Sequence, residues 1–526
     1  MTAPATLRMG HAVATAHPLA TDAALEVLRA GGNAADAAAA AAWMLAVVEP
    51  SGSGLGGQAT LLVHAADGTR TVLDGHSHAP QGSTRRAVDR AAQRRGFRAT
   101  TVPSMPVIVG ALGDRFGRLP LAQVLAPARR AAHEGFAVTP LLRRHVQWCA
   151  GALGSTEFAA RTFLVKGRAP RRGATLRQPE LAATLDRLAR HGVADFYTGA
   201  LAREIADDMR AHEGLVGPAD LASAATPAER RPLSFDFRGH EVVTVPPPGG
   251  GLQLLLGLRL AETLGLGDAA NDVEWYERFA LIVDAVFRER ARWPFPVEKL
   301  TPSLIDWMLG AAHASEIAAE TLARVPRPRV AQAEGPGDTT HLCVADSDGM
   351  VVSLTQSIQS LFGAKVANER LGFFYNNYLC TCSRRLGPSR LRSGARPQSN
   401  AAPTVVFRGP AADPGAPWFT LGAAGSRRIT SSLLQVVTQV VLRGRSVAEA
   451  VDAPRVHPTL PGPYMVESRA SSPELLERLA RRFRGPLVPR AGHSYAMGCV
   501  QALVRAEDGA WSGVADPRRE GVGHGE

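Results

Sequence analysis

The sequence predicts a large protein that mixes helices with strands, of the α/β or α+β class rather than a bundle of helices. Its 526 residues, 45% of them hydrophobic and 20% charged, suffice for a large core and more than one domain-sized unit. Two helix-like segments, 13–28 and 34–47, are followed directly by two strand-like segments, 59–64 and 71–74. A second strand pair follows a stretch rich in Pro and Gly late in the chain, so strands occur in both halves.

The N-terminal elements are delimited by apolar periodicity and by glycine. Residues 13–28 begin as a short strand and continue as an amphipathic helix, which the run Gly31-Gly32-Asn33 ends. Residues 34–47 form a second, mostly apolar helix. A Gly-rich loop, EPSGSGLGGQ, then leads into the first strand pair.

The middle of the chain is predicted to be mostly helical. Residues 104–197 have a helical pattern with breaks at glycines, and 233–245 is strand-like. The loop PPPGGG is first rigid and then flexible, and it precedes two further helices, at 252–264 and 273–287.

Residues 326–338, PRPRVAQAEGPGD, are the best linker in the chain, and we expect them to be exposed and mobile. A short apolar strand follows at 342–345, the Asp-Gly turn of DSDG comes next, and 350–355 returns as a second strand. An Asp-Gly turn between two strand-like runs is a strong hairpin signal. The linker divides the chain into a segment 1–338 and a segment 339–526.

Composition argues against several classes of function. The net charge of +11 comes mostly from arginines spread in pairs along the chain without interleaved aromatics, which favours a solvated surface over a nucleic-acid partner. Five cysteines fit a reducing compartment, and the pair Cys380 and Cys382 lacks the companions of a metal site, so no metal and no cofactor are expected. The N-terminus shows no signal peptide and no run long enough to span a membrane, so we expect a soluble cytoplasmic protein.

One junction, Asp338-Thr339, has the arrangement that an N-terminal nucleophile needs. A threonine hydroxyl is a poor nucleophile unless a base lies beside it, and its own free α-amino group, with a pKa of about 7.7–8.0, is one solution. The threonine must then sit on a strand directly after a segment that can be cut, as Thr339 does. Taken alone this pattern is weak, because threonine at the start of a strand is usually only a good strand former.

Many motifs in order resemble those of the γ-glutamyltranspeptidase family of N-terminal-nucleophile hydrolases, over nearly the whole chain. The motifs are AHPLATDAALEVLRAGGNAADAAAA, EPSGSGLGG, GLVGPADLA, PPPGGGLQLL, DTTHLCVADSDGMVVSLTQSIQSLFGAKV, LGFFYNN, RPQSNAAPTVV, GAAGSRRI and APRVHP. The resemblance implies a four-layer αββα sandwich made as one precursor. It implies that Thr339 attacks the Asp338 carbonyl, that the cut gives two subunits forming a heterodimer, and that Thr339 then forms an acyl-enzyme with a small-molecule substrate.

The resemblance also assigns catalytic roles. The hydroxyl that hydrogen-bonds the nucleophile falls on Ser357, with Thr355 on the same strand face as a second candidate that is more simply a packing residue. The oxyanion-hole pair falls on Ala424 and Gly425. Ala424 replaces a glycine, which is tolerable if the donor is a backbone N–H.

The positions that hold a γ-glutamyl group in this family have changed. His76 stands at the position of the arginine that pairs with the α-carboxylate, and Thr381 at that of the aspartate that binds the α-ammonium. Gln359 stands at the position of the asparagine, and Ser399 and Asn400 stand at those of the serine pair. Histidine does not reproduce a bidentate arginine–carboxylate contact. An arginine from elsewhere, such as Arg427 or Arg428, is the alternative. Two further residues are expected near this pocket: Gln58 and His78.

The sequence therefore predicts a retained acyl-transfer site with a different substrate pocket. The substrate is expected not to be a standard γ-glutamyl compound. The hypothesis is that the enzyme cuts an amide bond or a carbon–carbon bond next to a carbonyl, in the biosynthesis of alkylproline-type antibiotic precursors. Two alternatives stay open: an ordinary glutathione hydrolase and γ-glutamyl transferase, and an unprocessed, inactive binding protein.

Overall fold

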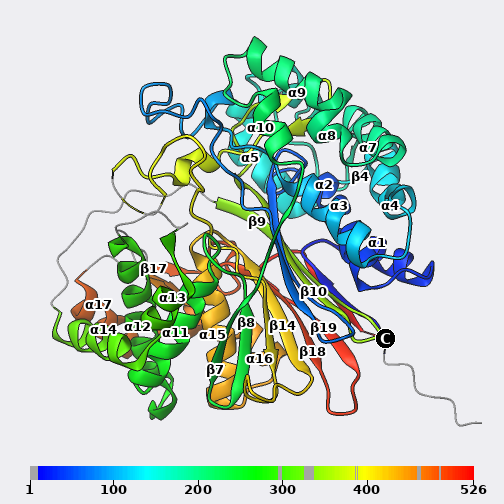
Figure 1. Cartoon of the computed structure of the whole chain (residues 1–526). Coiled ribbons are helices and arrows are strands. Elements are labelled where there is room, and N and C mark those ends of the chain that lie inside the picture. Colours follow the sequence, from blue (N-terminus) through cyan, green and yellow to red (C-terminus); the bar gives the residue numbers. More distant parts are fainter. Residues whose placement is uncertain are drawn as a thin grey trace, which may run out of the picture.

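Two β-sheets lie face to face between two layers of helices (Figure 1). This computed structural model describes residues 10–293, 299–324, 337–385, 387, 389–458, 464–484 and 487–525. Helices of the N-terminal third cover the outer face of one sheet, at the top of Figure 1, and later helices cover the other. The predicted four-layer αββα sandwich of the α+β class is confirmed.

The first sheet has seven strands and carries the junction. All neighbours run antiparallel. The order is β20 (Val522–Gly525), β1 (Ala12–Thr15), β9 (Gly337–Ala345), β10 (Val351–Ser360), β2 (Gln58–His64), β3 (Arg70–Asp74) and β6 (Ala228–Arg230).

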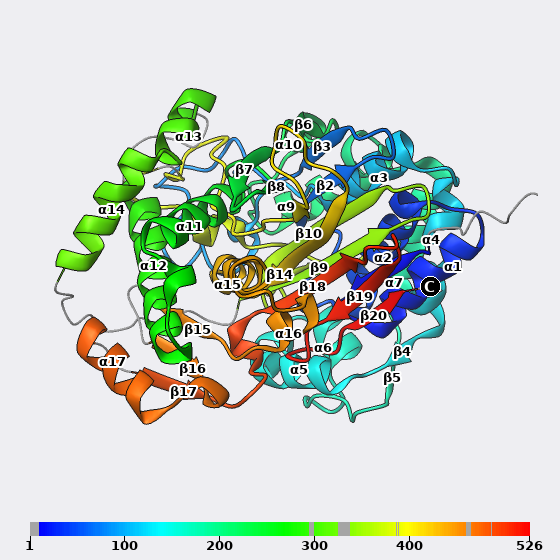
Figure 2. The ribbon, with the colours of Figure 1, turned by 90° about the horizontal axis from the view of Figure 1, so that it is seen from below.

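The second sheet has six strands, which Figure 2 shows from below beside the first. Its neighbours are also antiparallel. The order is β19 (Trp511–Ala515), β18 (Cys499–Arg505), β14 (Pro417–Ala424), β13 (Thr404–Phe407), β8 (His240–Thr244) and β7 (Leu233–Phe237). Three smaller sheets pair β4 (Phe136–Ala137) with β5 (Thr175–Leu176), β11 (Ala367–Asn368) with β12 (Phe373–Phe374), and β15 (Val456–Pro458) with β16 (Tyr464–Glu467) and β17 (Leu487–Arg490).

The two helical layers follow the chain order. The first contains α1 (Pro18–Arg29), α2 (Ala34–Val48), α3 (Met105–Phe116), α4 (Leu121–Glu134), α5 (Pro140–Leu153), α6 (Glu157–Phe163), α7 (Pro179–His191), α8 (Asp195–Thr198), α9 (Ala200–Ala211) and α10 (Pro218–Ser223). The second contains α11 (Gly251–Thr263), α12 (Asp272–Arg292), α13 (Pro302–Met308), α14 (Ala311–Ala323), α15 (Arg428–Arg443), α16 (Val447–Asp452) and α17 (Pro473–Phe483). The segment 104–197, expected to be helical with breaks, also contributes the short strands β4 and β5.

Strand alternation explains why the sheets form the two inner layers. Along β2, Leu61 and Val63 pack against the first helical layer, whereas Leu62 between them packs against the second sheet. Successive strand residues point to opposite faces, so a strand that is apolar at every position is buried on both sides. The described core therefore has three large parts, one between the sheets and one under each helical layer, and a smaller fourth cluster that includes Val88, Leu379 and Leu391.

Local polar contacts fix the hairpin that begins at the junction. Asn33 and Asp36 form a capping box at the start of α2. The Asp346 carboxylate, in the turn between β9 and β10, accepts a hydrogen bond of 2.8 Å from the Ala34 amide of the same helix. Gly349 closes that turn with a φ of +93°, which favours glycine. The predicted Asp-Gly hairpin is therefore present and tied to the first helical layer.

The predicted linker ends earlier than expected. Gly337 and Asp338 already belong to β9, where they pair with Ser360 and Gln359 of β10. Most of the linker, 326–336, lies outside the described residues, so the division into segments 1–338 and 339–526 stays a prediction. Within the described ranges, no helix is both long and apolar enough to cross a membrane.

Candidate active site

Thr339 lies on the central strand β9, with its hydroxyl against the bond predicted to be cut. Its Oγ1 is 2.7 Å from the Asp338 carbonyl oxygen and 3.1 Å from Ser357 Oγ. Ser357 in turn donates to the same carbonyl at 2.8 Å and accepts from the Gln359 amide at 2.9 Å. The Ser357 hydroxyl therefore contacts both the Thr339 hydroxyl and the Asp338 carbonyl that Thr339 would attack.

An irregularity of β10 places this serine. The register between β9 and β10 shifts between Gln356 and Gln359, and Gln359 has a φ of +82°. Bulges of this kind re-aim side chains and often lie next to active sites. Ser357 is thereby brought to Thr339 within an otherwise regular hairpin.

The side chain of Asp338 is held in a buried polar pocket. Its carboxylate lies 2.8 Å from the Arg519 guanidinium, 3.4 Å from Ser51 Oγ and 3.5 Å from His145 Nδ1. Burial raises the pKa of Asp338, but Arg519 and the other hydrogen-bonding neighbours outweigh it, so the pKa is lowered and the group is an anion. Arg519 also donates to the Thr339 carbonyl at 2.9 Å. It therefore holds groups on both sides of the Asp338–Thr339 peptide bond.

The histidine of this pocket is uncharged. His145 Nδ1 is 2.8 Å from Ser51 Oγ, and burial lowers its pKa to about 4. Its ring packs edge-on against Tyr495 at 5.0 Å between centroids, and the Arg519 guanidinium lies 4.7 Å from the same tyrosine ring. The ion pair at the junction is thus enclosed by uncharged rings.

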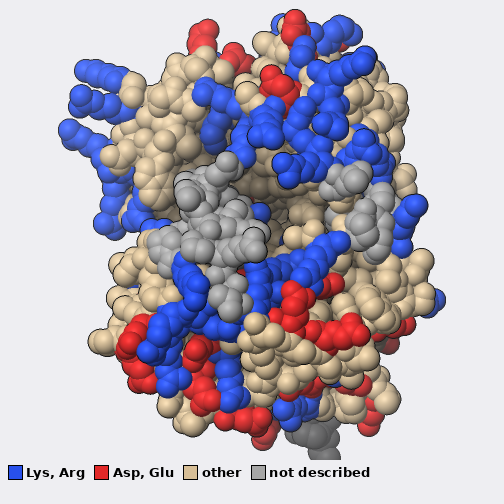
Figure 3. All heavy atoms as spheres, turned by 90° about the vertical axis from the view of Figure 1, so that its left-hand side faces the viewer, with Lys and Arg blue, Asp and Glu red and all other residues tan. Residues whose placement is uncertain are grey.

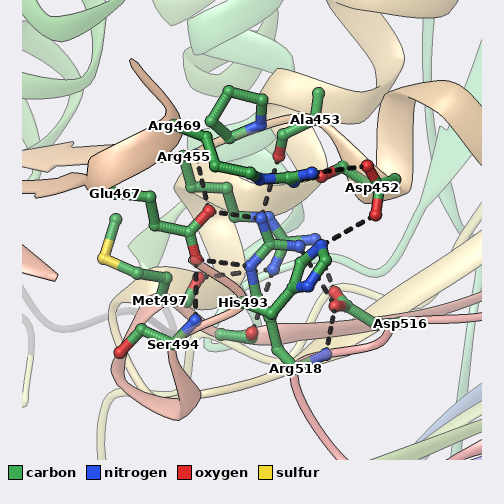
Figure 4. A network of polar contacts seen from close by, with 12 residues as sticks. Asp452, Ala453, Arg455, Glu467, Arg469, His493, Ser494, Met497, Asp516 and Arg518 are labelled. Atoms are coloured by element: carbon green, nitrogen blue, oxygen red, sulfur yellow. Dashed lines mark hydrogen bonds and ion pairs between the residues drawn. The ribbon is translucent and has the colours of Figure 1, made fainter. Parts of the chain in front are cut away.

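Arg519 directly follows Arg518, which belongs to a buried cluster of charges (Figure 4). The side chain of Arg518 is fully buried and binds both Glu467 and Asp516. Arg455 binds the other oxygen of Asp516 at 2.5 Å. These contacts fix the turn before β20, so that Arg518 faces the cluster and Arg519 faces Thr339. Neither arginine was predicted from the sequence, in which the run Asp516-Pro517-Arg518-Arg519 shows clustered charges but not their partners.

Thr339 and Ser357 open onto a cavity of about 1120 Å³. Four of the five predicted substrate-binding residues line it: Gln359, Thr381, Ser399 and Asn400. Gln58 lines it as well, with its side-chain oxygen bound to Ser77. The structure therefore brings these residues to one place with the nucleophile, although their contact with substrate stays a prediction.

The cavity wall is cationic. Five arginines and one lysine line it: Arg94, Arg95, Arg288, Arg290, Arg427 and Lys365. None of the described lining residues is acidic. The face drawn in Figure 3 is hollowed, and Lys and Arg side chains surround the hollow.

His76 does not join this set. It is buried outside the described cavity lining, with Nδ1 2.6 Å from Asp74. Arg230 at 3.1 Å and Arg396 at 2.9 Å also bind Asp74. His76 therefore contacts a buried carboxylate that two arginines already pair. His78 is also outside the lining and lies 3.3 Å from Ser223. The geometry gives no support to the predicted contact of His76 with substrate.

Thr355 packs in the sheet, as the simpler of its two predicted roles requires, although it also lines the cavity. Its hydroxyl is 2.8 Å from Nδ1 of His341, which is buried in the sheet. Burial lowers the pKa of His341 to about 3, so this ring is neutral. Ser357, not Thr355, is the hydroxyl that meets Thr339.

The two residues of the predicted oxyanion hole, Ala424 and Gly425, lie at the end of β14 in the second sheet. Ala424 is the last residue of β14 and pairs with Cys499, and Gly425 has a φ of +123°, which a side chain would strain. A Cβ at Gly425 would also lie 2.8 Å from Gly498 Cα. The next residues, Ser426 and Arg427, line the cavity. The oxyanion role of Ala424 and Gly425 stays a prediction.

Tyr378 also lies beside Ser357, although no role was predicted for it from the sequence. Its phenol interacts with Ser357 and Gln58, and burial raises its pKa well above the ordinary value. It lines the cavity beside Thr381. The nearby motif LGFFYNN was recognised only as a family marker.

The sandwich and a threonine on a central strand, with its hydroxyl beside the preceding carbonyl, define an N-terminal-nucleophile hydrolase. The chain belongs to the γ-glutamyltranspeptidase family, whose sequence pattern it matches over residues 20–525. A glutathione hydrolase proenzyme of Escherichia coli (strain K12) is 29% identical over 543 residues, covering 96% of this chain and 90% of that protein. An acylase ACY 1 proenzyme of Pseudomonas sp. (strain V22) is 33% identical over 540 residues, covering 99% and 94%. The crystal structure of cephalosporin acylase from Bacillus halodurans superimposes with a TM-score of 0.85 at 28% identity, covering 99% of this chain and 98% of that one. The chain is therefore similar to hydrolases and acylases of this family and is an enzyme of this type.

Proposed function

We propose that the chain cuts itself between Asp338 and Thr339 and then uses the freed Thr339 to cleave a carbonyl compound that is not a standard γ-glutamyl amide. The observation that carries the proposal is the position of Thr339 Oγ1, which is 2.7 Å from the Asp338 carbonyl oxygen and borders a large cavity.

The contacts at the junction support a chemically complete self-cleavage. Thr339 Oγ adds to the Asp338 carbonyl carbon, the C–N bond breaks, and the acyl group moves from nitrogen to oxygen as an ester. Ser357 donates a hydrogen bond to the oxygen on which negative charge develops. In this shift the hydroxyl proton passes to the leaving nitrogen, which frees the α-amino group of Thr339. Water then hydrolyses the ester, which releases the new C-terminal carboxylate of Asp338 and the Thr339 hydroxyl beside the free amine. That amine is the base for later turnovers.

The charge of the cavity supports a substrate without the α-ammonium of a γ-glutamyl group. Thr381 stands where the family has an aspartate, and the described lining offers six cationic residues and no carboxylate. An ammonium ion placed there would lose water without gaining a partner of opposite charge. An acyl group that keeps a carboxylate and lacks the ammonium suits this wall better.

Two p-nitroanilides that differ by that one group test the proposal. We expect glutaryl-p-nitroanilide to be hydrolysed with a kcat/KM at least tenfold higher than γ-glutamyl-p-nitroanilide, and neither by the Thr339→Ala variant. Equal or faster hydrolysis of the γ-glutamyl compound would show instead an ordinary γ-glutamyl hydrolase. A wild-type protein that stays uncleaved and inactive would support the binding-protein alternative.

The same nucleophile could also cut a carbon–carbon bond, and we propose this as the route to a role in alkylproline-type antibiotic biosynthesis. Addition of Thr339 Oγ to a ketone gives the same kind of oxyanion as addition to an amide. The C–C bond then breaks, and its electron pair leaves with the departing carbon as a carbanion that a neighbouring carbonyl stabilises. A proton neutralises this carbanion, and water hydrolyses the ester left on Thr339. Loss of the enol absorbance of a carboxylated β-diketone, in wild type but not in Thr339→Ala, is the expected result. Persistence of that absorbance with an active, processed enzyme would limit the reaction to amides.

A further inference from the structure

Lys365 is a lysine in a chain that uses arginine for almost all of its positive charge. Of the 59 basic residues, three are lysines: Lys166, Lys299 and Lys365. The first two are exposed, whereas Lys365 is partly buried and lines the cavity that Thr339 borders. An arginine supplies charge alone, but a lysine amine can also lose its proton and act as a nucleophile. The one lysine of the described cavity lining is therefore a candidate for chemistry as well as for charge.

The turn that carries Lys365 is strained and firmly held. It joins β10 to β11, and Phe362, Gly363 and Lys365 have positive φ values of +53°, +51° and +62°. For a residue with a side chain such a φ costs energy, and it persists where the surroundings enforce it, often at functional sites. The Lys365 amide donates to the Phe362 carbonyl at 2.9 Å, and the Ala364 amide donates to the Tyr375 carbonyl at 2.8 Å. The fold thus holds a lysine beside the cavity at a position where glycine would be less strained.

The surroundings of the amine favour its neutral form. Burial lowers the pKa of Lys365, and the nearby Arg95 guanidinium lowers it as well. The Asp338 carboxylate and the thiols of Cys149 and Cys380 have the opposite effect, but the net shift is downward. In the described part of the chain, no carboxylate lies within ion-pair distance of the amine. A desolvated lysine beside another cation is a common form of an activated amine nucleophile.

We propose that the Lys365 amine is a second nucleophile of the cavity, which captures an aldehyde or a ketone as an imine. The neutral amine adds its electron pair to the carbonyl carbon, its two hydrogens leave with the carbonyl oxygen as water, and a C=N bond remains. Addition of water reverses the reaction. The cations of the cavity wall attract anionic carbonyl compounds toward this amine.

Capture requires neither the cut at Thr339 nor turnover, so it does not depend on the proposed function. For a substrate with two carbonyls, capture of one by Lys365 holds the other in the cavity that Thr339 borders. This use of the imine, unlike its formation, rests on the proposed function.

Reductive trapping with glyoxylate tests the capture, because cyanoborohydride converts the imine into a stable amine that peptide mapping locates. The Thr339→Ala chain is labelled beside wild type, since it lacks the second cavity amine that self-cleavage would free. At neutral pH we expect Lys365 to be labelled about tenfold faster than Lys166 or Lys299 in both proteins, although it is the least exposed of the three. Its labelling rate should also reach a plateau at a lower pH than theirs.

Lys365→Arg keeps the positive charge and loses the amine, and Lys166→Arg is the matched control at an exposed lysine. The first should abolish the fast labelling and the second should leave it unchanged, with melting temperatures showing that both variants are folded. Labelling of Lys365 no faster than that of Lys166 or Lys299, or fast labelling that persists in Lys365→Arg, would overturn the inference. Trapping at Lys365 without hydrolysis of either p-nitroanilide would instead contradict the proposed function and leave the capture standing.

Discussion

At the scale of single residues, Ser357 contacts both the Thr339 hydroxyl and the carbonyl of the bond that we propose is cut. It accepts from Thr339 and donates to the Asp338 carbonyl. We expect Ser357→Ala to slow self-cleavage roughly 10- to 100-fold, because two hydrogen bonds to the reacting groups are lost. Ser357→Thr keeps the hydroxyl and should stay near the wild-type rate. The time course of the uncleaved band on a denaturing gel measures both, and equal rates for alanine and threonine would contradict the assigned role.

Arg519 and Asp338 form a buried ion pair whose members depend on each other. In a Thr339→Ala background, which keeps the chain intact, we expect Arg519→Met to lower the free energy of unfolding by about 3 to 5 kcal/mol, because it leaves a buried carboxylate unpaired. Adding Asp338→Asn removes that charge and should recover much of the loss. Urea denaturation of the single and double variants measures the coupling. Losses that simply add would show that the pair is not coupled.

At the scale of elements, β9 packs closely against β14 of the other sheet at Gly422, a residue of β14 that has no side chain. A Cβ at Gly422 would lie 2.1 Å from Cε1 of His341, and the whole imidazole ring lies close by. We expect Gly422→Ala to cost about 1 to 3 kcal/mol of stability, as overpacking of a core does. Gly151→Ala in α5 is the control, since its Cβ meets nothing within 4 Å and alanine favours a helix. Equal melting temperatures for the two variants would contradict the tight packing.

The elements were predictable from local sequence signals and the nucleophile from the resemblance of the motif around it, whereas the charges around them were not. Periodicity located α2 and β2, and the Asp-Gly turn located the hairpin of β9 and β10. The linker boundary was wrong because Gly337 and Asp338 gain strand partners in β10 that linker composition does not reveal. Arg519 reaches the junction across 180 residues. Arg290 likewise reaches the Ser399 loop across 109, and no local pattern encodes such contacts.

At the scale of the whole molecule, the two predicted segments are interleaved in both sheets. In the first sheet, β9 lies between β1 and β10, and β10 pairs with β2. In the second, β13 pairs with β8. We therefore expect the two fragments to elute together from a sizing column after self-cleavage and to separate only in denaturant. Separate elution under native conditions would contradict this arrangement.

Buried neutral histidines predict that the fold weakens in mild acid. Burial lowers the pKa of His341 from its ordinary value of 6.5 to about 3. The unfolded chain therefore takes up a proton below about pH 6.5 while the folded chain does not, so stability is full above that pH and falls as the pH drops toward 3. At pH 5 this amounts to about 2 kcal/mol for one such histidine. Melting temperatures at pH 7.5 and 5 should differ less in His341→Gln than in wild type or in the exposed-site control His191→Gln. An equal acid shift in all three would count against the buried-histidine explanation.

Self-cleavage at Asp338–Thr339 is the claim on which the others depend, and the intact mass of the purified protein tests it most directly. Wild type should give two polypeptides, the smaller beginning at Thr339, and Thr339→Ala should give one chain of 55.6 kDa. A wild-type protein that remains a single chain of that mass, or a Thr339→Ala variant cut at the same bond, would contradict the account.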